Sequence, residues 1–436
     1  MQVIDINSNI NFGQAKVVKK IVKSQHLETI FNKKLQKYPE DYKYFKLLGK
    51  KLGLTEKNLY KLNSIVGPHE LEIILQNANY NSFNPGNNLI HGKLSVHNFE
   101  ELAERGFSYN LHMHTTYSDG KMSIKSLLDQ AAKYADILYA KTSKRFIIAI
   151  TDHDTLEGNK KALEIIAKNP DKYKNLGVVL GAELSALYKE HKMLAKPFAY
   201  EMIAYAVNPF DAVLNTNLAN LRQNRIKLSK KIIKDASKIY PNFEFSYKEM
   251  CKSYKNPKKG IDGFLYAIAD YLEAKTGNLP NIRDLSLQYM PKVNEKSNGI
   301  VNVAENIFQH AKKQLGFFGI AHPGKIYLGS GKISNDFIKQ CKLENKSAGK
   351  VIIDTFLEYL KKFGKGKLKA IETNYQSYDG TLNAAQEALN NPSVIPDKSL
   401  EGSMKWLDNF REFSRKNNLL NTGGLDTHSE NPFLRK

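Results

Sequence analysis

Cysteine is scarce in this sequence, and so are long apolar runs. Only two cysteines, Cys251 and Cys341, occur in 436 residues, which is too few for a disulfide framework or a thiolate zinc site. Residues 1–9 lack the basic start and apolar core of a signal peptide, and no run approaches the roughly 18 apolar residues of a membrane span. We therefore expect a soluble, cytoplasmic protein that does not bind membranes.

Acidic residues are also in short supply. The chain has 65 Lys and Arg against 44 Asp and Glu, a formal net charge of +21. Lysines that neutralise phosphates give sequence-independent affinity for nucleic acids, and basic surfaces steer small phosphorylated substrates as well. Because the basic residues are spread along the chain and not gathered in one stripe, the charge favours an anionic substrate in general more than a polymer.

Two histidines one residue apart stand in residues 109–120. On a strand, residues i and i+2 share a face, so His112 and His114 would point the same way, and Asp119 follows shortly after. Imidazole is a common ligand for Zn, Mn and Fe. A His-x-His pair alone is weak evidence for a metal site, since such pairs also occur on polar strand faces.

The same pattern, an apolar run that stops at a ligand-type residue, recurs along the chain. The residues reached in this way are His153 (after 146–151, between Asp152 and Asp154), Glu183 (after 177–182), His322 (after 317–321), and Asp426 and His428 (after 419–425). A parallel barrel explains the recurrence, because its apolar strands bring their C-terminal ends to one mouth.

In this order, the motifs His-x-His, Ser-Asp-Gly, Asp-His-Asp, Gly-Ala-Glu, Ala-His-Pro-Gly and Gly-Leu-Asp-Thr-His resemble those of the PHP (polymerase and histidinol phosphatase) superfamily of metal-dependent phosphoesterases, nearest to its nucleotide phosphatase and ribonuclease-like branch. The motifs are specific only in combination. The resemblance implies an α/β fold, the distorted (β/α) barrel of seven strands that the family has, over residues 106–436. A helical region, residues 1–105, precedes the barrel, and a mainly helical lid is inserted at about 210–315, which is too long for an ordinary loop.

The resemblance also implies a site of two or three divalent ions (Mn, Fe or Zn) that activates water to hydrolyse a phosphate ester. Glu183 would bridge ions, with His112, His114 and Asp426 on one, Asp119, His153 and His428 on another, and His322 with Glu201 on a third. The residues with a catalytic role would be His112, His114, Glu183, His322, Asp426 and His428. Asp152 and Asp154 would orient ligands.

One position departs from the family pattern. At the start of the strand after the Gly-Ala-Glu motif, where the family has His, this chain has Glu201. The connection from Glu183 is too short for a crossover helix, so we expect a hairpin-like, antiparallel return that lets Glu201 reach the metals. A carboxylate there would favour Mn, Fe or Mg over Zn. The alternative is a solvated Glu201 and one ion weakly held or missing.

The inserted segment opens with a helix, residues 218–226, that resembles the Arg-bearing helix of PHP nucleotide phosphatases. Arg222 and Arg225 share a face at i and i+3, so both could bind one phosphate of the substrate. The alternative is a solvated basic face. The Arg-x-His element that those relatives carry is missing from the nearest match, residues 260–265, which puts their substrate in doubt for this chain.

These motifs favour hydrolysis of a phosphorylated small molecule, a nucleotide, or a short single-stranded nucleic acid. Alternatives are a small-metabolite phosphatase of the histidinol phosphate type, and a degenerate, non-catalytic metal-binding module.

Apolar periodicity predicts helices at 27–35, 42–54, from Thr55, at 68–75, 124–135 (capped by Ser123), 160–168 and 404–416, and a strand at 368–375. Four other histidines are expected to be surface or packing residues and not metal ligands: His26, His69, His91 and His97.

Overall fold

In the computed structural model, the described residues are 53–66, 99–104, 106–188, 198–253, 265–278, 316–322, 368–375 and 410–428, with 47, 49–50 and 343. The predicted helices at 27–35 and 68–75, the 260–264 part of the degenerate motif and His26, His69, His91 and His97 lie outside these ranges. The chain divides into two compact units, Met1–Tyr60 and Lys61–Lys436. Within the described ranges, no helix has the length and apolar character needed to cross a membrane.

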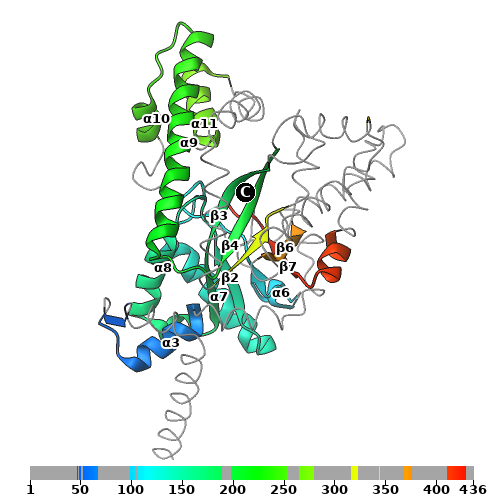
Figure 1. The fold of residues 1–436 in the computed structure, drawn as a ribbon. Coiled ribbons are helices and arrows are strands. Elements are labelled where there is room, and N and C mark those ends of the chain that lie inside the picture. The colour runs from blue at the N-terminus through cyan, green and yellow to red at the C-terminus, as the bar shows by residue number, and fades with distance from the viewer. Residues whose placement is uncertain are drawn as a thin grey trace, which may run out of the picture. The chain divides into compact units, whose positions relative to one another are not determined.

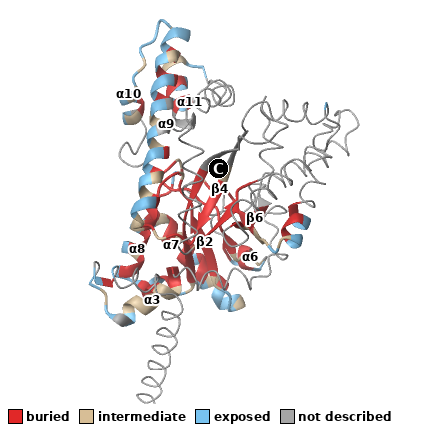
Figure 2. Ribbon diagram, in the orientation of Figure 1, coloured by how far each residue is buried: buried red, intermediate tan, exposed pale blue. Residues whose placement is uncertain are grey.

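A sheet of seven strands in chain order forms the centre of the second unit (Figure 1). Its strands are β1 (Tyr109–Asn110), β2 (Phe146–Ile150), β3 (Leu176–Tyr188), β4 (Phe198–Tyr205), β5 (Phe317–Ile320), β6 (Leu368–Tyr375) and β7 (Leu420–Gly424). All five residues of β2 are buried, as expected for a parallel strand covered on both faces. Figure 2 shows buried residues concentrated in the strands.

The sheet is mixed, and β4 is the strand that makes it so. Pairs β1–β2, β2–β3, β5–β6 and β6–β7 are parallel, whereas β4 runs antiparallel to both β3 and β5. The expected antiparallel return is therefore confirmed. The expectation that the preceding strand stops at Glu183 is wrong, because β4 gives residues 181–188 a hydrogen-bonding partner and β3 continues to Tyr188.

The sheet curls until its first and last strands meet. Leu111 donates its backbone N–H to Gly423 (3.0 Å), His114 donates to Thr427 (2.9 Å), and Met113 forms a bridge with Thr427. The result is a nearly closed, barrel-like sheet. Contrary to the sequence-based expectation, His112 and His114 lie beyond β1, which has only two residues, but the bridge at Met113 between them is part of a strand-like pairing.

Helices follow the strands as the apolar periodicity predicts. The helix α7 (Ile124–Thr142) begins after Ser123, whose side chain accepts the N–H of Ser126, and it packs against β2 and β3. It runs seven residues past the predicted end at Ala135. The helix α8 (Glu157–Lys168) begins three residues before the predicted start and is followed by η2 (Pro170–Tyr173).

Two further helices lie before β1, and the predicted C-terminal helix is present in part. The two helices before β1 are α3 (Glu56–Val66), which begins directly after Thr55 as predicted, and α6 (Phe99–Glu104), which packs on α7. Residues 47, 49 and 50, inside the predicted helix at 42–54, are helical, and so are residues 410–416.

The described part of the insertion is helical, as predicted. It begins with α9 (Ala212–Ile239), far longer than the predicted segment, followed by α10 (Tyr247–Ser253) and α11 (Leu265–Thr276). The distal half of α9 packs with α10 and α11 around a small apolar core of its own, formed by Ile232, Ile233, Ala236, Met250, Ile268, Tyr271 and Leu272. The proximal half carries Arg222 and Arg225.

Candidate metal centre

Nine predicted ligands from several strand ends converge at one mouth of the sheet. They are His112 and His114 after β1, Asp119 in the next loop, His153 after β2, Glu183 on β3, Glu201 on β4, His322 after β5, and Asp426 and His428 after β7. All of them except His322 belong to three groups of side chains, each with ligand atoms within 4.8 Å of one another, and the groups share members. His322 lies beside the third group.

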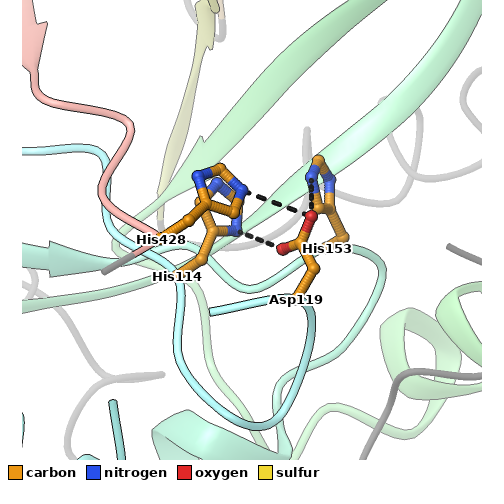
Figure 3. A group of neighbouring side chains, drawn as sticks. All are labelled: His114, Asp119, His153 and His428. Carbon is orange, nitrogen blue, oxygen red and sulfur yellow. Dashed lines mark ion pairs between the residues drawn. The ribbon is translucent and has the colours of Figure 1, made fainter. Parts of the chain in front are cut away.

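The outermost group centres on Asp119 (Figure 3). Its Oδ1 lies 3.6 Å from His114 Nδ1, and its Oδ2 lies 3.2 Å from His428 Nε2 and 3.7 Å from His153 Nε2. The loop that carries Asp119 packs tightly on the backbone of His114. A Cβ on Gly120 would come within 2.3 Å of the His114 carbonyl, so this approach requires glycine.

The second group is fully buried and centres on Glu183. Its Oε2 lies 3.1 Å from His112 Nε2 and 3.2 Å from His114 Nε2. Asp426 completes the group, with Oδ1 at 3.5 Å from His112 Nε2 and 3.2 Å from His114 Nε2. His114 therefore belongs to two groups, one through each ring nitrogen.

The third group joins Glu183 to Glu201. His153 Nδ1 lies 3.3 Å from Glu183 Oε2 and 3.9 Å from Glu201 Oε1. His322 Nε2 lies 2.9 Å from Glu183 Oε1 and 3.3 Å from Glu201 Oε2. Glu201 is thus inside the cluster and not a remote surface residue, although it is 29% exposed. Compared with the sequence-based grouping, His114 gains a place beside Asp119, and His153 gains one beside Glu201.

The residues present fit divalent ions. Ligands about 2.0–2.2 Å from a metal lie about 3.0–3.5 Å apart in tetrahedral or octahedral geometry. The distances in the second group, 3.1–3.5 Å, match that spacing. Within the described residues, buried atoms with no hydrogen-bond partner include His112 Nε2, His114 Nε2 and Glu183 Oε2, which face one another. Such atoms are costly unless a cation satisfies them.

The electrostatics of the cluster also favour bound cations. Burial alone would lower the pKa of His114, but the neighbouring carboxylates of Asp426 and Glu183 raise it to about 10. Burial would raise the pKa of Glu183, yet His112 and His153 hold it well below its usual value. The carboxylates therefore attract positive charge strongly at this mouth, which divalent ions would supply.

Asp152 does not belong to the three ligand groups but binds the loop that follows His114. Its carboxylate accepts hydrogen bonds from Thr115 N (2.7 Å) and Ser118 Oγ (2.8 Å), and Ser118 Oγ lies 3.4 Å from His114 Nδ1. Asp152 is fully buried. Its contacts fit the expected role of orienting ligands, because they hold the 114–119 loop in place.

Asp154, the other residue expected to orient ligands, forms an ion pair with the inserted helix α9. Its Oδ2 pairs with Arg225 Nε at 2.5 Å, which ties α9 to the barrel beside His153. Arg225 is 23% exposed, and the fields of Glu201 and Asp119 act on it in addition to that of Asp154. Asp154 donates its backbone N–H to Glu183 O (2.9 Å). Arg222 lies one turn away on α9 and is partly buried.

One residue of the site was missed by the sequence analysis. Glu372, on β6, has both carboxylate oxygens 3.3 Å from His112 Nδ1, and Oε2 accepts the backbone N–H of His322 at 2.8 Å. The signal was a carboxylate within the apolar strand 368–375, where a charge needs a partner.

Comparisons with known proteins give little further information. No family model matches the chain, and no curated protein matches it. A solved structure described as a "putative metal-dependent phosphoesterase" from Bifidobacterium adolescentis is 20% identical, with a TM-score of 0.44, covering 74% of this chain and 88% of that chain. An amidohydrolase from Chromobacterium violaceum, with bound sulfate and no metal, is 16% identical, with a TM-score of 0.43, covering 76% and 90%. Both TM-scores lie below 0.5.

Proposed function

We propose that this chain is a metal-dependent phosphoesterase of the PHP superfamily, with two or three divalent ions (Mn, Fe or Zn) and a nucleotide or short oligonucleotide as substrate. The observation that supports this best is the set of three overlapping ligand groups, joined by His114, His153 and Glu183. Neighbouring ions that share ligands suit in-line displacement at phosphorus, because they stabilise both the attacking and the leaving oxygen.

The chain's own residues have defined parts in this proposal. Divalent ions bound here would lower the pKa of a coordinated water and polarise a phosphoryl oxygen. Glu183 would help to hold the ions of both the second and the third group, because its Oε2 lies near His112, His114 and His153 and its Oε1 lies near His322. Asp119 and His428 would hold the ion nearest to solvent, since His428 is 25% exposed while His112 is fully buried. Arg225 would bind a phosphate that does not react.

Two alternatives remain as outcomes of the test. A small-metabolite phosphatase would use the same metal site on a compound such as histidinol phosphate. A degenerate binding module would have lost some of the ligands, whereas here all nine side chains meet in one place. That convergence favours an enzyme.

The direct test is a metal assay combined with a panel of phosphate esters. Purified protein should carry two to three divalent ions and hydrolyse p-nitrophenyl phosphate or its bis ester with Mn. A nucleoside monophosphate, a nucleoside 3′,5′-bisphosphate, histidinol phosphate and a short RNA would then rank the substrate classes. Chelation should abolish hydrolysis and re-addition of Mn should restore it. Activity that persists without metal would refute the proposal, and bound metal without hydrolysis would favour the binding module.

Glu201 provides a prediction about metal preference. Glu201→Leu should lower metal content and rate, because the third group then keeps only His153 and Glu183, with His322 beside them. Glu201→His should keep the ion and shift its preference toward Zn, since imidazole is a softer ligand than carboxylate. Metal analysis after loading with an equimolar Mn and Zn mixture measures both effects. Unchanged stoichiometry and rate in Glu201→Leu would support the solvated alternative.

Arg225 provides a prediction about substrate binding. Arg225→Ala should raise KM with little change in kcat, because a residue that binds a non-reacting phosphate contributes equally to the ground and transition states. The effect should shrink on a substrate with a single phosphate. Arg222→Ala, measured in parallel, shows whether the neighbouring arginine shares the role.

A control is needed because Arg225 is the ion-pair partner of the buried Asp154. Removing Arg225 leaves the Asp154 carboxylate, only 2% exposed, without its cation, which could disturb His153 indirectly. The double variant Asp154→Asn/Arg225→Ala removes that charge as well. Lys227→Ala, an exposed residue of the same helix, controls for net charge. KM values equal to wild type in Arg225→Ala and in Arg222→Ala would return α9 to a structural role.

A further inference from the structure

We infer that Glu372 is a positioning residue that fixes two predicted metal ligands at once, His112 through its ring and His322 through its backbone. This inference rests on the metal site of the proposed function but not on its substrate or reaction. Glu372 is fully buried on β6, which pairs with β5, the strand before His322, and with β7, the strand that meets the segment before His112.

The contact with His112 selects a tautomer. A carboxylate only accepts hydrogen bonds, so with both oxygens 3.3 Å from Nδ1 it favours the ring form that carries the proton on Nδ1. The lone pair of the neutral ring then lies on Nε2. That nitrogen is the one facing Glu183 (3.1 Å) and Asp426 (3.5 Å), where an ion would bind.

The contact with His322 stabilises an unusual backbone conformation of that residue. His322 has a φ of +23°, a region that non-glycine residues rarely occupy and that the surrounding structure must stabilise. Its N–H donates to Glu372 Oε2 at 2.8 Å, a charge-assisted hydrogen bond. This conformation places His322 Nε2 at 2.9 Å from Glu183 and 3.3 Å from Glu201. Glu372 therefore acts on both the second and the third ligand group.

The charge of Glu372 has no other explanation among the described residues. No lysine or arginine in that part of the chain forms an ion pair with it, and a buried carboxylate without a cation is expensive. Its carboxylate contacts Nδ1 of His112, and Nε2 of the same ring belongs to the second ligand group. Ions bound there would compensate the charge, which links this buried acid to metal binding instead of to packing.

The test uses the isosteric substitution Glu372→Gln. One oxygen becomes an NH2 group, which either repels Nδ1–H of His112 or donates to Nδ1 and selects the opposite tautomer, with the proton on Nε2. We expect metal affinity to fall about 10- to 100-fold, as for other residues that orient metal ligands. Competition with a fluorescent chelator measures the affinity for Zn and Mn, and the metal-induced rise in Tm gives a second readout. Thr373→Val, at the neighbouring buried position of β6, controls for disturbance of the strand.

The wild-type protein provides the decisive second measurement. In the zinc-loaded wild type, long-range 1H–15N NMR should show His112 protonated at Nδ1 and coordinated through Nε2, and this result does not require any variant to fold. A wild-type His112 protonated at Nε2, or Glu372→Gln with metal affinity within twofold of wild type, would overturn the inference. Loss of phosphoesterase activity in every assay, with metal affinity and tautomer as expected, would refute the proposed function and leave the role of Glu372 standing.

Discussion

His114→Ala is expected to remove at least one divalent ion per chain and to slow phosphate ester hydrolysis about 100-fold or more, a loss of about 2.7 kcal/mol of transition-state stabilisation. The reason is that His114 belongs to two ligand groups, through Nδ1 beside Asp119 and through Nε2 beside Glu183 and Asp426. Metal analysis of the purified variant and initial rates with Mn measure the two effects.

A third readout separates metal loss from a damaged active site. A ligand that binds only the folded protein at 100 times its Kd stabilises the fold by about 2.7 kcal/mol, so Tm should rise when metal is added to the stripped wild type. The rise should be much smaller in His114→Ala. His97→Ala, a histidine predicted not to bind metal, should behave like wild type. Full metal content and rate in His114→Ala would exclude it as a ligand.

Glu183→Gln should have an effect at least as large, because Glu183 joins the second and third groups. Its Oε2 lies near His112, His114 and His153, and its Oε1 lies near His322. Gln keeps the size of the side chain and removes the charge, and one of its two terminal atoms can no longer bind metal. We expect loss of two ions, or of one ion with a second bound weakly, and a rate at least about 100-fold lower.

The matched control is Glu164→Gln on α8, where an exposed glutamate pairs with Lys161. It makes the same change in net charge on the exposed surface of α8 and should leave metal content and rate unchanged. Glu183→Gln also tests the bridging role directly. If only the ion of the second group is lost and the third stays at full occupancy, Glu183 is a terminal ligand and not a bridge.

The sequence by itself predicted most of the elements around the site. Apolar runs predicted β2 and β6, and the Ser123 cap predicted the start of α7, because burial period and capping are local properties of the chain. The ligand-type residues after such runs predicted which side chains would meet, since parallel strands bring their C-terminal ends to one mouth. The short connection after Glu183 predicted the antiparallel β4.

Other features depended on contacts between residues distant in the sequence. The length of β3 depends on its pairing with β4, and the pairing of His114 with two groups depends on the loop that returns Asp119 to it. The pairing of Asp154 with Arg225 joins residues 71 positions apart. No local pattern fixes such distances, because they are set by how the sheet closes.

Glu372 shows the limit most clearly. Its place within a buried strand is visible in the sequence, but its partners lie 260 and 50 positions away, on the ring of His112 and the backbone of His322. Sequence fixes the chemistry of a side chain and the period of its strand. Only the closed sheet brings β1, β5 and β6 together, so only the tertiary structure decides that one carboxylate holds two ligands.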